Sequence, residues 1–163
     1  YNNFPVVFTR TANIFGPYQQ LYRIIPKAIM CAKKKINLEL HGGGSSIRSF
    51  ILMEDVNNAL YKILFDKNNV TQTYHISTNQ FISIKDLVIK IFKKINSNTS
   101  LIKITDERKG KDHGYLLNSS KLRKTYKWKD EFKLDEGINE TIKWVEKNYK
   151  ILKNQKLKYS HKS

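Results

Sequence analysis

An apolar run that leads through a tight turn into a helix is the pattern that most constrains this chain. Phe4–Thr9 is a continuous series of aromatic and β-branched residues, and Gly16-Pro17 interrupts the chain soon after it. From Arg23 to Lys35, apolar residues recur at helical spacing. Continuous apolar runs are typical of strands buried in parallel sheets, and open α/β sheets hold ligands beyond the carboxyl ends of such strands. The segment from Thr9 to Gly44 therefore predicts one wall of a ligand site in an α/β domain.

The rest of the chain alternates short strands with amphipathic helices. Strand patterns are predicted at Asn37–His41, 48–53, Thr71–Ile76 and Leu101–Ile104. Helices are predicted from near Glu54, from an N-cap at Ser83, from Ser119 or Ser120, and over Asp135–Leu152. The helix that begins near Glu54 is expected to bury Val56, Ala59, Leu60, Ile63 and Leu64.

The length and the single cysteine limit the class of protein. A chain of 163 residues is long enough for one domain with a hydrophobic core. Cys31 has no partner for an internal disulfide, so we expect a buried free thiol in a reducing, cytoplasmic compartment. No apolar run is long enough to span a bilayer. The chain opens with Tyr1 and a strand pattern follows at once, which predicts that other strands of the sheet come from a preceding segment.

The net charge of +16 leaves two alternatives open. The first is a non-catalytic basic module that binds nucleic acid or another polyanion. The second is a lysine-rich surface on a protein that binds a small anion. The second is favoured, because the lysines are scattered and no zinc-finger, helix-turn-helix or RNA-recognition motif accompanies them. We therefore expect no nucleic-acid partner and no membrane partner.

Three arginines are the best candidates for binding an anion. Arg23 begins a helix, Arg48 follows a glycine turn, and Arg108 lies in a charged loop. Guanidinium groups bind phosphate in bidentate fashion, so converging arginines would form a diphosphate clamp. Gly42–Gly44 has neither phosphate-loop spacing and is interpreted as a turn between strands. The histidines have no metal-ligand spacing and there is no G-x-S-x-G motif, so the chain is expected to bind rather than to react.

Several motifs, in order along the chain, resemble one enzyme family. They are R-T-A-N-I-F-G-P-Y-Q-Q at 10–20, I-I-P-K-A-I at 24–29, L-H-G-G-G-S-S-I-R-S-F at 40–50, E-D-V at 54–56, and D-E-R-K-G-K-D-H-G-Y at 106–115. Together they are similar to the extended short-chain dehydrogenase/reductase (NAD-dependent epimerase/dehydratase) family, and within it to the dTDP-glucose 4,6-dehydratase branch. The resemblance covers Phe4 to about Tyr149.

The resemblance implies an α/β fold that corresponds to the C-terminal part of an extended NAD(P)-binding Rossmann-fold protein. It would contain one strand of the Rossmann sheet (1–16), a mostly helical substrate-binding lobe with short strands (17–152), and a basic flexible tail (153–163). The implied function is the substrate-binding half of an NAD-dependent nucleotide-sugar 4,6-dehydratase in activated deoxysugar and surface polysaccharide biosynthesis. By the resemblance, the glycine fingerprint and the catalytic Tyr-x-x-x-Lys pair of the family belong upstream of the motifs matched in this chain. The whole protein is expected to be a cytoplasmic homodimer that binds NAD and a nucleotide-diphosphate sugar.

The resemblance also assigns site residues. Asn13 would contact the substrate, and Ile14 would approach NAD through its backbone. The nucleotide-diphosphate site would be lined by Arg23, Ile24, Ile25, Pro26, Lys27, Ala28, Glu39, Leu40 and His41. Arg48 and Arg108 would clamp the diphosphate, with Lys111, and Asp112 as a further candidate, near the nucleotide.

Three departures from the dehydratase pattern keep the reaction open. The chain has Asn13-Ile-Phe-Gly16 where Asn-Asn-Tyr-Gly is usual, Arg48-Ser-Phe50 where Arg-Asp-Trp is usual, and Lys109 where proline is expected. A nucleotide-sugar epimerase or decarboxylase of the same superfamily is therefore the alternative.

Overall fold

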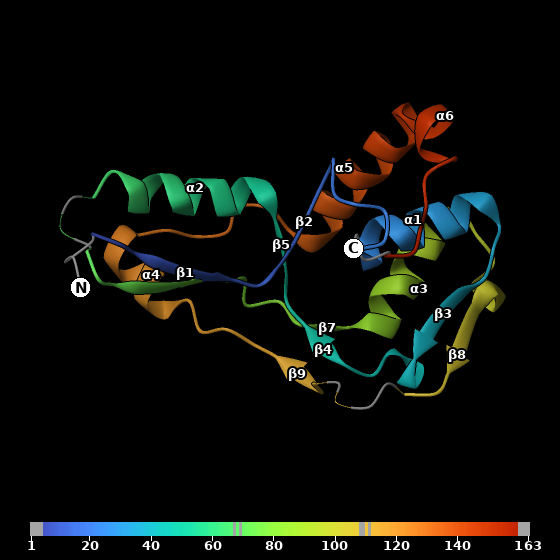
Figure 1. The fold of residues 1–163 in the computed structure, drawn as a ribbon, viewed down its shortest axis with the longest axis horizontal. Coiled ribbons are helices and arrows are strands. Elements are labelled where there is room, and N and C mark those ends of the chain that lie inside the picture. Colours follow the sequence, from blue (N-terminus) through green and yellow to red (C-terminus); the bar gives the residue numbers. More distant parts are fainter. Residues whose placement is uncertain (1–4, 67, 69, 108–109, 111, 160–163) are drawn as a thin grey trace.

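The computed structural model describes residues 5–66, 68, 70–107, 110 and 112–159 (Figure 1). Its helices are α1 Ile24–Lys34, α2 Met53–Leu64, α3 Ile84–Lys94, α4 Ser120–Tyr126, α5 Leu134–Lys147 and α6 Tyr149–Leu152, with short 3-10 turns at Gly42–Gly44 and Thr99–Leu101. Its strands are β1 Phe8–Thr11, β2 Asn13–Phe15, β3 Leu38–His41, β4 Ile47–Arg48, β5 Phe50–Leu52, β6 Thr73–Ile76, β7 Ile82–Ser83, β8 Ile102–Thr105 and β9 Gly114–Tyr115.

The strands form small, mainly parallel sheets. β1 pairs with β6, β2 with β5, and β3 with β8, all in parallel. β4 runs antiparallel to β7 and parallel to β9. Figure 1 shows an elongated molecule with β1, β6, α2 and α4 at one end, and α1, α3, β3 and β8 at the other. The predicted α/β class is confirmed, and the expected first strand has a parallel partner, β6, from the segment assigned to the lobe.

The first strand differs from the prediction in position and in burial. We expected a buried strand over Phe4–Thr9, but β1 begins at Phe8, whose side chain is 58% exposed. Phe4 lies outside the described residues. An apolar run becomes buried only where other elements cover it, and here the neighbouring core includes Ala12 and contacts Val7 without covering Phe8.

Two hydrophobic cores correspond to the two ends of the molecule. One lies among α1, α3, α5 and β3 and contains the largest apolar side chains of those elements. The other joins α2, β6 and α4 and includes Trp128. On α2, Val56, Ala59 and Ile63 are buried as predicted, but Leu60 and Leu64 are exposed, so that part of the predicted core is wrong. Both line a groove that α2 forms with Val7 and Thr9.

Local signals in the sequence account for several helix ends. The predicted cap of α3 is confirmed, because the Ser83 hydroxyl accepts a hydrogen bond from the Asp86 backbone N–H at 3.0 Å. The predicted single helix over Asp135–Leu152 is wrong, since it is divided at Asn148. Asn148 leaves the helical region, with φ of −105° and ψ of 11°, and both its side-chain amide at 2.8 Å and its backbone N–H at 3.1 Å donate to the Trp144 carbonyl.

Two further expectations concern the single cysteine and membrane-spanning helices. Cys31 is buried in α1 and free, as predicted, and burial raises the pKa of its thiol. Among the described helices, none has the length and apolar character needed to cross a membrane.

Candidate functional site

A cavity of about 580 Å³ lies where β2 ends and α1 begins. Gly16, Pro17 and Tyr18 turn the chain between the two elements, and Tyr18 adopts a left-handed backbone with φ of 67°. The lining comes from β1, β2, β5, the segment that joins β2 to α1, and the start of α1. Its residues are Thr11, Ala12, Asn13, Ile14, Phe15, Gln19, Gln20, Tyr22, Arg23, Ile24, Ile25 and Phe50. This volume is in the range of small-molecule sites, and the location agrees with the predicted ligand wall.

Arg23 gives the helix side of the cavity a positive charge. It is the N-cap residue of the 11-residue helix α1, and the first turn of that helix contains no acidic residue. Its guanidinium lies 5.4 Å from the centroid of the Tyr22 ring. The free N–H groups and the dipole at a helix N-terminus favour an anion, and the arginine adds a full charge. This part of the cavity is therefore suited to an anionic group.

Two amide side chains fix the strand side of the cavity. Asn13 donates from Nδ2 to the Ser49 carbonyl at 3.1 Å. Gln19 donates from Nε2 to the Ile14 carbonyl at 2.7 Å, which ties the turn back onto β2. Sequence analysis did not identify Gln19 or Tyr22 as site residues. Both residues lie between the Gly16-Pro17 turn and α1, and that position could have indicated them.

Arg48 stands apart from the cavity lining. Its guanidinium donates to the carbonyls of Ile47 at 2.8 Å and Asp112 at 2.9 Å, so it fastens β4 to the charged loop before β9. The Ser46 hydroxyl donates to the same Asp112 carbonyl at 3.2 Å. Arg108 and Lys111, the other predicted cations of this loop, lie outside the described residues.

The remaining predicted site residues occupy α1 and β3. Pro26 and Ala28 are buried in α1, where Ala28 belongs to the hydrophobic core, and Lys27 is half-buried. On β3, Glu39 is exposed, Leu40 is buried and His41 is half-buried. The His41 Nδ1 lies 3.0 Å from the Thr105 hydroxyl of β8. The structure therefore gathers Asn13, Ile14, Arg23, Ile24 and Ile25 around the cavity, and places the other described candidates outside its lining.

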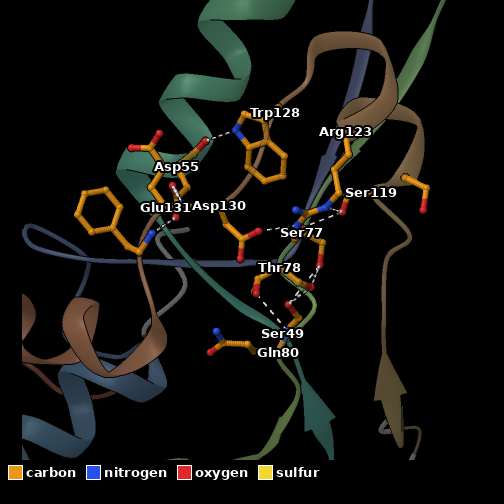
Figure 2. Close-up of polar contacts among 12 residues, drawn as sticks. Ser49, Asp55, Ser77, Thr78, Gln80, Ser119, Arg123, Trp128, Asp130 and Glu131 are labelled. Carbon is orange, nitrogen blue, oxygen red and sulfur yellow. Dashed lines mark hydrogen bonds and ion pairs between the residues drawn. The ribbon is translucent and has the colours of Figure 1, made fainter.

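A network of polar side chains around Ser49, the residue before β5, supports the β2 side of the cavity (Figure 2). Ser49, whose carbonyl holds Asn13, is fully buried, and its hydroxyl lies 3.2 Å from that of Ser77. The Ser77 carbonyl accepts hydrogen bonds from Ser119 at 3.0 Å and from Arg123 at 3.0 Å. Ser119 or Ser120 was predicted to cap α4. Ser119 holds the N-cap position, but its side chain makes no cap hydrogen bond, and the Asn118 side chain accepts from the Ser120 N–H.

Two aspartates anchor the segment that follows α4. Arg123 pairs with Asp130 at 2.6 Å. The fully buried Asp55 carboxylate accepts backbone N–H groups of Glu131 at 2.8 Å and Phe132 at 3.3 Å, and the Asp55 carbonyl accepts the Trp128 indole N–H at 3.3 Å (Figure 2). These bonds hold a loop without regular structure against the start of α2.

The electrostatic environments of these two aspartates differ. Burial raises the pKa of Asp55, although the two backbone N–H groups oppose that shift. Burial also acts on Asp130, but hydrogen bonds from Arg123 and Thr78 outweigh it and hold the pKa of that carboxyl below its ordinary value. Both groups lie in the supporting network rather than in the cavity lining, so we assign them a structural role.

Among the residues that the structure describes, no group of three or more His, Cys, Asp or Glu side chains could hold a metal ion. The cavity is a binding surface built from an arginine, amides, a helix N-terminus and apolar side chains.

The family is decided by comparison with known proteins. A sequence model of the family described as GDP-mannose 4,6 dehydratase matches residues 1–141. The chain belongs to that family. The resemblance deduced from the motifs is therefore confirmed at the level of the family.

Individual relatives of this dehydratase-family chain act on nucleotide sugars, according to their names. It is 34% identical over 145 residues to a trifunctional UDP-glucose 4,6-dehydratase/epimerase/reductase of Arabidopsis thaliana, covering 88% of this chain and 21% of that protein. It is 32% identical over 157 residues to the dTDP-D-glucose 4,6-dehydratase of Mus musculus, covering 93% of this chain and 44% of that one. The chain thus spans less than half the length of these relatives.

Solved structures of nucleotide-sugar enzymes share its fold. The dTDP-glucose 4,6-dehydratase of Bacillus anthracis, determined in complex with NAD, matches with a TM-score of 0.85 and 27% identity, over 92% of this chain and 47% of that one. A UDP-glucose 4-epimerase of Thermotoga maritima matches in fold with a TM-score of 0.80 at 20% identity, over 88% and 46%. The dehydratase-family chain therefore has the fold of the corresponding half of NAD-dependent enzymes.

Proposed function

We propose that this chain is the substrate-binding half of an NAD-dependent nucleotide-sugar 4,6-dehydratase. The observation that carries the proposal is the cavity at the start of α1, where Arg23 and the helix N-terminus meet the amides of β2 and its turn. Membership of the dehydratase family supports the same function. The product would be an activated deoxysugar of the kind used in surface polysaccharides, made in the cytoplasm by a homodimer.

The diphosphate of the nucleotide sugar would bind at the N-terminus of α1. The backbone N–H groups there and the Arg23 guanidinium offer directed donors and a positive charge. The clamp would be completed by Arg48 and Arg108, and the nucleoside would extend toward Lys111 and β3. Lys27, Glu39 and the half-buried His41 would supply polar groups on that side, while the buried Pro26, Ala28 and Leu40 would support that surface from the core.

The hexose would lie next to β2. The Ser49 carbonyl holds the Asn13 side chain in one orientation. Asn13 could therefore contact sugar hydroxyls with little further loss of conformational entropy on binding. The network of Figure 2 keeps Ser49 in place. The chemical contribution of this half is orientation of the reacting sugar.

The residues present fit only one edge of a dinucleotide site. The chain lacks a G-x-G-x-x-G turn, and Ile14 is the residue that the resemblance assigns to the cofactor. Ile14 does line the cavity, with its backbone fixed by Gln19. NAD, when bound, would supply the hydride acceptor that sugar dehydration requires. Residues 1–16 would then belong to the cofactor-binding domain, 17–152 to the substrate-binding lobe and 153–163 to a C-terminal tail.

The mass of the product tests the reaction. The complete gene product should be incubated with NAD and UDP-glucose, dTDP-glucose or UDP-glucuronic acid, and the sugar nucleotide analysed by mass spectrometry and, for the configuration at C4, by NMR. A 4,6-dehydratase removes one water from the hexose and leaves a 4-keto-6-deoxy sugar. A product of unchanged mass with inverted C4 would indicate the alternative, an epimerase, and loss of carbon dioxide from a nucleotide-linked uronic acid would indicate a decarboxylase. Absence of binding and turnover with all of these substrates would contradict the proposal.

A further inference from the structure

The described part of the predicted C-terminal tail, 153–159, packs against the hydrophobic core and against Tyr22. Beyond α6, the Gln155 N–H donates to the Leu152 carbonyl at 3.0 Å, and Leu157 packs against the main hydrophobic core. Figure 1 shows the chain running back from α6 to the N-terminal end of α1, where the C-terminus is marked. The segment 153–159 therefore ends beside the cavity.

Tyr159 makes the contact that links this segment to the site. Its ring meets the Tyr22 ring edge-on, with centroids 5.2 Å apart and an interplanar angle of 66°. Tyr22 lines the cavity and also carries the Arg23 guanidinium 5.4 Å from its ring centroid. Tyr22 thus contacts both the C-terminal aromatic residue and the cation that we assign to the diphosphate.

This arrangement has a consequence for the mobility of Arg23. A free arginine side chain loses considerable rotational freedom when it binds a ligand, and that loss weakens binding. A cation–π contact restricts the guanidinium in advance, provided that the ring beneath it is itself fixed. An edge-on aromatic pair stabilises a ring in this way, so Tyr159 would act on Arg23 through Tyr22.

We propose that residues 153–159 form part of the wall of the nucleotide-sugar site, with Tyr159 as a positioning residue for Arg23. The inference rests on the proposed function, because the ligand concerned is the diphosphate of a nucleotide sugar. Lys153, Lys156 and Lys158 are exposed on the same segment and add positive charge on the approach to the site.

Calorimetric titration of the complete gene product with UDP-glucose, dTDP-glucose and, separately, NAD tests the inference. Tyr159→Ala is expected to weaken nucleotide-sugar binding about two- to tenfold. Tyr159→Phe keeps the ring and should restore affinity to nearly that of the unmodified protein. Lys150→Ala is the matched control, because Lys150 is exposed on α6, outside this segment, and the variant should keep the affinity of the unmodified protein. NAD affinity and the thermal midpoint should be unchanged in all three variants.

The outcomes separate this inference from the proposed function. If the unmodified protein binds a nucleotide sugar and Tyr159→Ala binds it equally well, the role of the C-terminal segment is overturned and the proposed function stands. An equal loss of nucleotide-sugar and NAD affinity, or a fall in the thermal midpoint, would show a general structural role and also overturn it. If the unmodified protein binds neither nucleotide sugar, both proposals fall.

Discussion

At the scale of single residues, Arg48 has a structural role that would also prepare it for the proposed ligand. The guanidinium has five N–H donors, and its bonds to the Ile47 and Asp112 carbonyls orient it while keeping its charge. It also draws the charged loop toward β4. A residue that fixes a loop in this way is well suited to complete a clamp to which that loop contributes.

We predict that Arg48→Ala weakens nucleotide-sugar binding to the complete gene product by about 1.5–3 kcal/mol, the scale of a charged hydrogen bond. Arg48→Lys should recover only part of the loss, because an ammonium group cannot reproduce the planar fork. Arg10→Ala is the control, since Arg10 is exposed on β1 and contacts His75 rather than the cavity. Calorimetry provides the measurement, and equal affinities for the Arg48→Ala variant and the unmodified protein would remove Arg48 from the clamp.

Asp130 is the residue for which the structure predicts a pH effect. Its pKa is lower in the folded chain than its ordinary value of 3.8. A carboxyl with a lowered folded pKa stabilises the fold above its ordinary pKa, and this stabilisation disappears as the pH falls through the folded value. Asp130→Asn should therefore reduce the free energy of unfolding by about 1–3 kcal/mol at pH 7. The difference should shrink once the pH falls below 3.8.

Urea unfolding of both proteins at neutral and acidic pH measures this difference. Glu140→Gln is the control, because the Glu140–Lys143 pair is exposed and such pairs contribute less than about 1 kcal/mol. A stability difference between Asp130→Asn and the unmodified protein that did not vary with pH would mean that the ion pair with Arg123 is not its source.

At the scale of elements, α5 depends on a glycine in its interior. Alanine normally forms helices better than glycine by about 1 kcal/mol. At Gly137, however, a Cβ atom would lie 2.6 Å from the Phe15 ring of β2 and 3.0 Å from Leu52 of β5. The absence of a side chain at this position lets the helix lie directly on the two strands that form the cavity edge.

Gly137→Ala should therefore destabilise the fold by about 1–3 kcal/mol despite its better helix propensity, because the added methyl group overpacks the contact. Lys143→Ala in the same helix is the matched control, since Lys143 is exposed and should change stability by less than about 0.5 kcal/mol. Thermal or urea unfolding measures both variants. A stabilised Gly137→Ala protein would mean that α5 can move away from β2 at little cost.

At the scale of the whole molecule, one face is markedly apolar. A groove of about 640 Å³ runs between β1 and α2, and its lining includes Val7, Leu60, Leu64 and Val70. Leu64 is 77% exposed. A contiguous exposed apolar surface favours association or binding of apolar probes, whereas scattered apolar residues do not.

The chain produced by itself should therefore bind a hydrophobic dye and elute early in size-exclusion chromatography. Leu64→Lys should reduce both effects. Ile151→Lys is the control, because Ile151 is 69% exposed but lies on α6, outside the groove. If the two variants behaved alike, the association would come from general hydrophobicity and not from this face.

The sequence by itself determined the features that depend on neighbouring residues. The α1 helix with Arg23 at its start, the Ser83 cap of α3 and the glycine turn after β3 follow from local periodicity and backbone preference, and the family followed from motifs in order. Within the cavity lining, Asn13, Ile14, Ile24 and Ile25 were named through the resemblance to the family, and Arg23 was also named as a cation at a helix start. These residues are close in sequence, so their proximity in space needs no knowledge of the fold.

Only the tertiary structure decided which distant residues meet. The pairing of β1 with β6, the bonds from Asp55 to the segment after α4, and the contact of Tyr159 with Tyr22 join segments far apart in the chain. The exposure of Phe8 and Leu64 likewise depends on which distant segments cover them. A lysine-rich tail or an apolar run has the same local pattern whether or not another element covers it. Burial and long-range contact are properties of the packed molecule, and they place the C-terminal segment beside the cavity that the N-terminal segment forms.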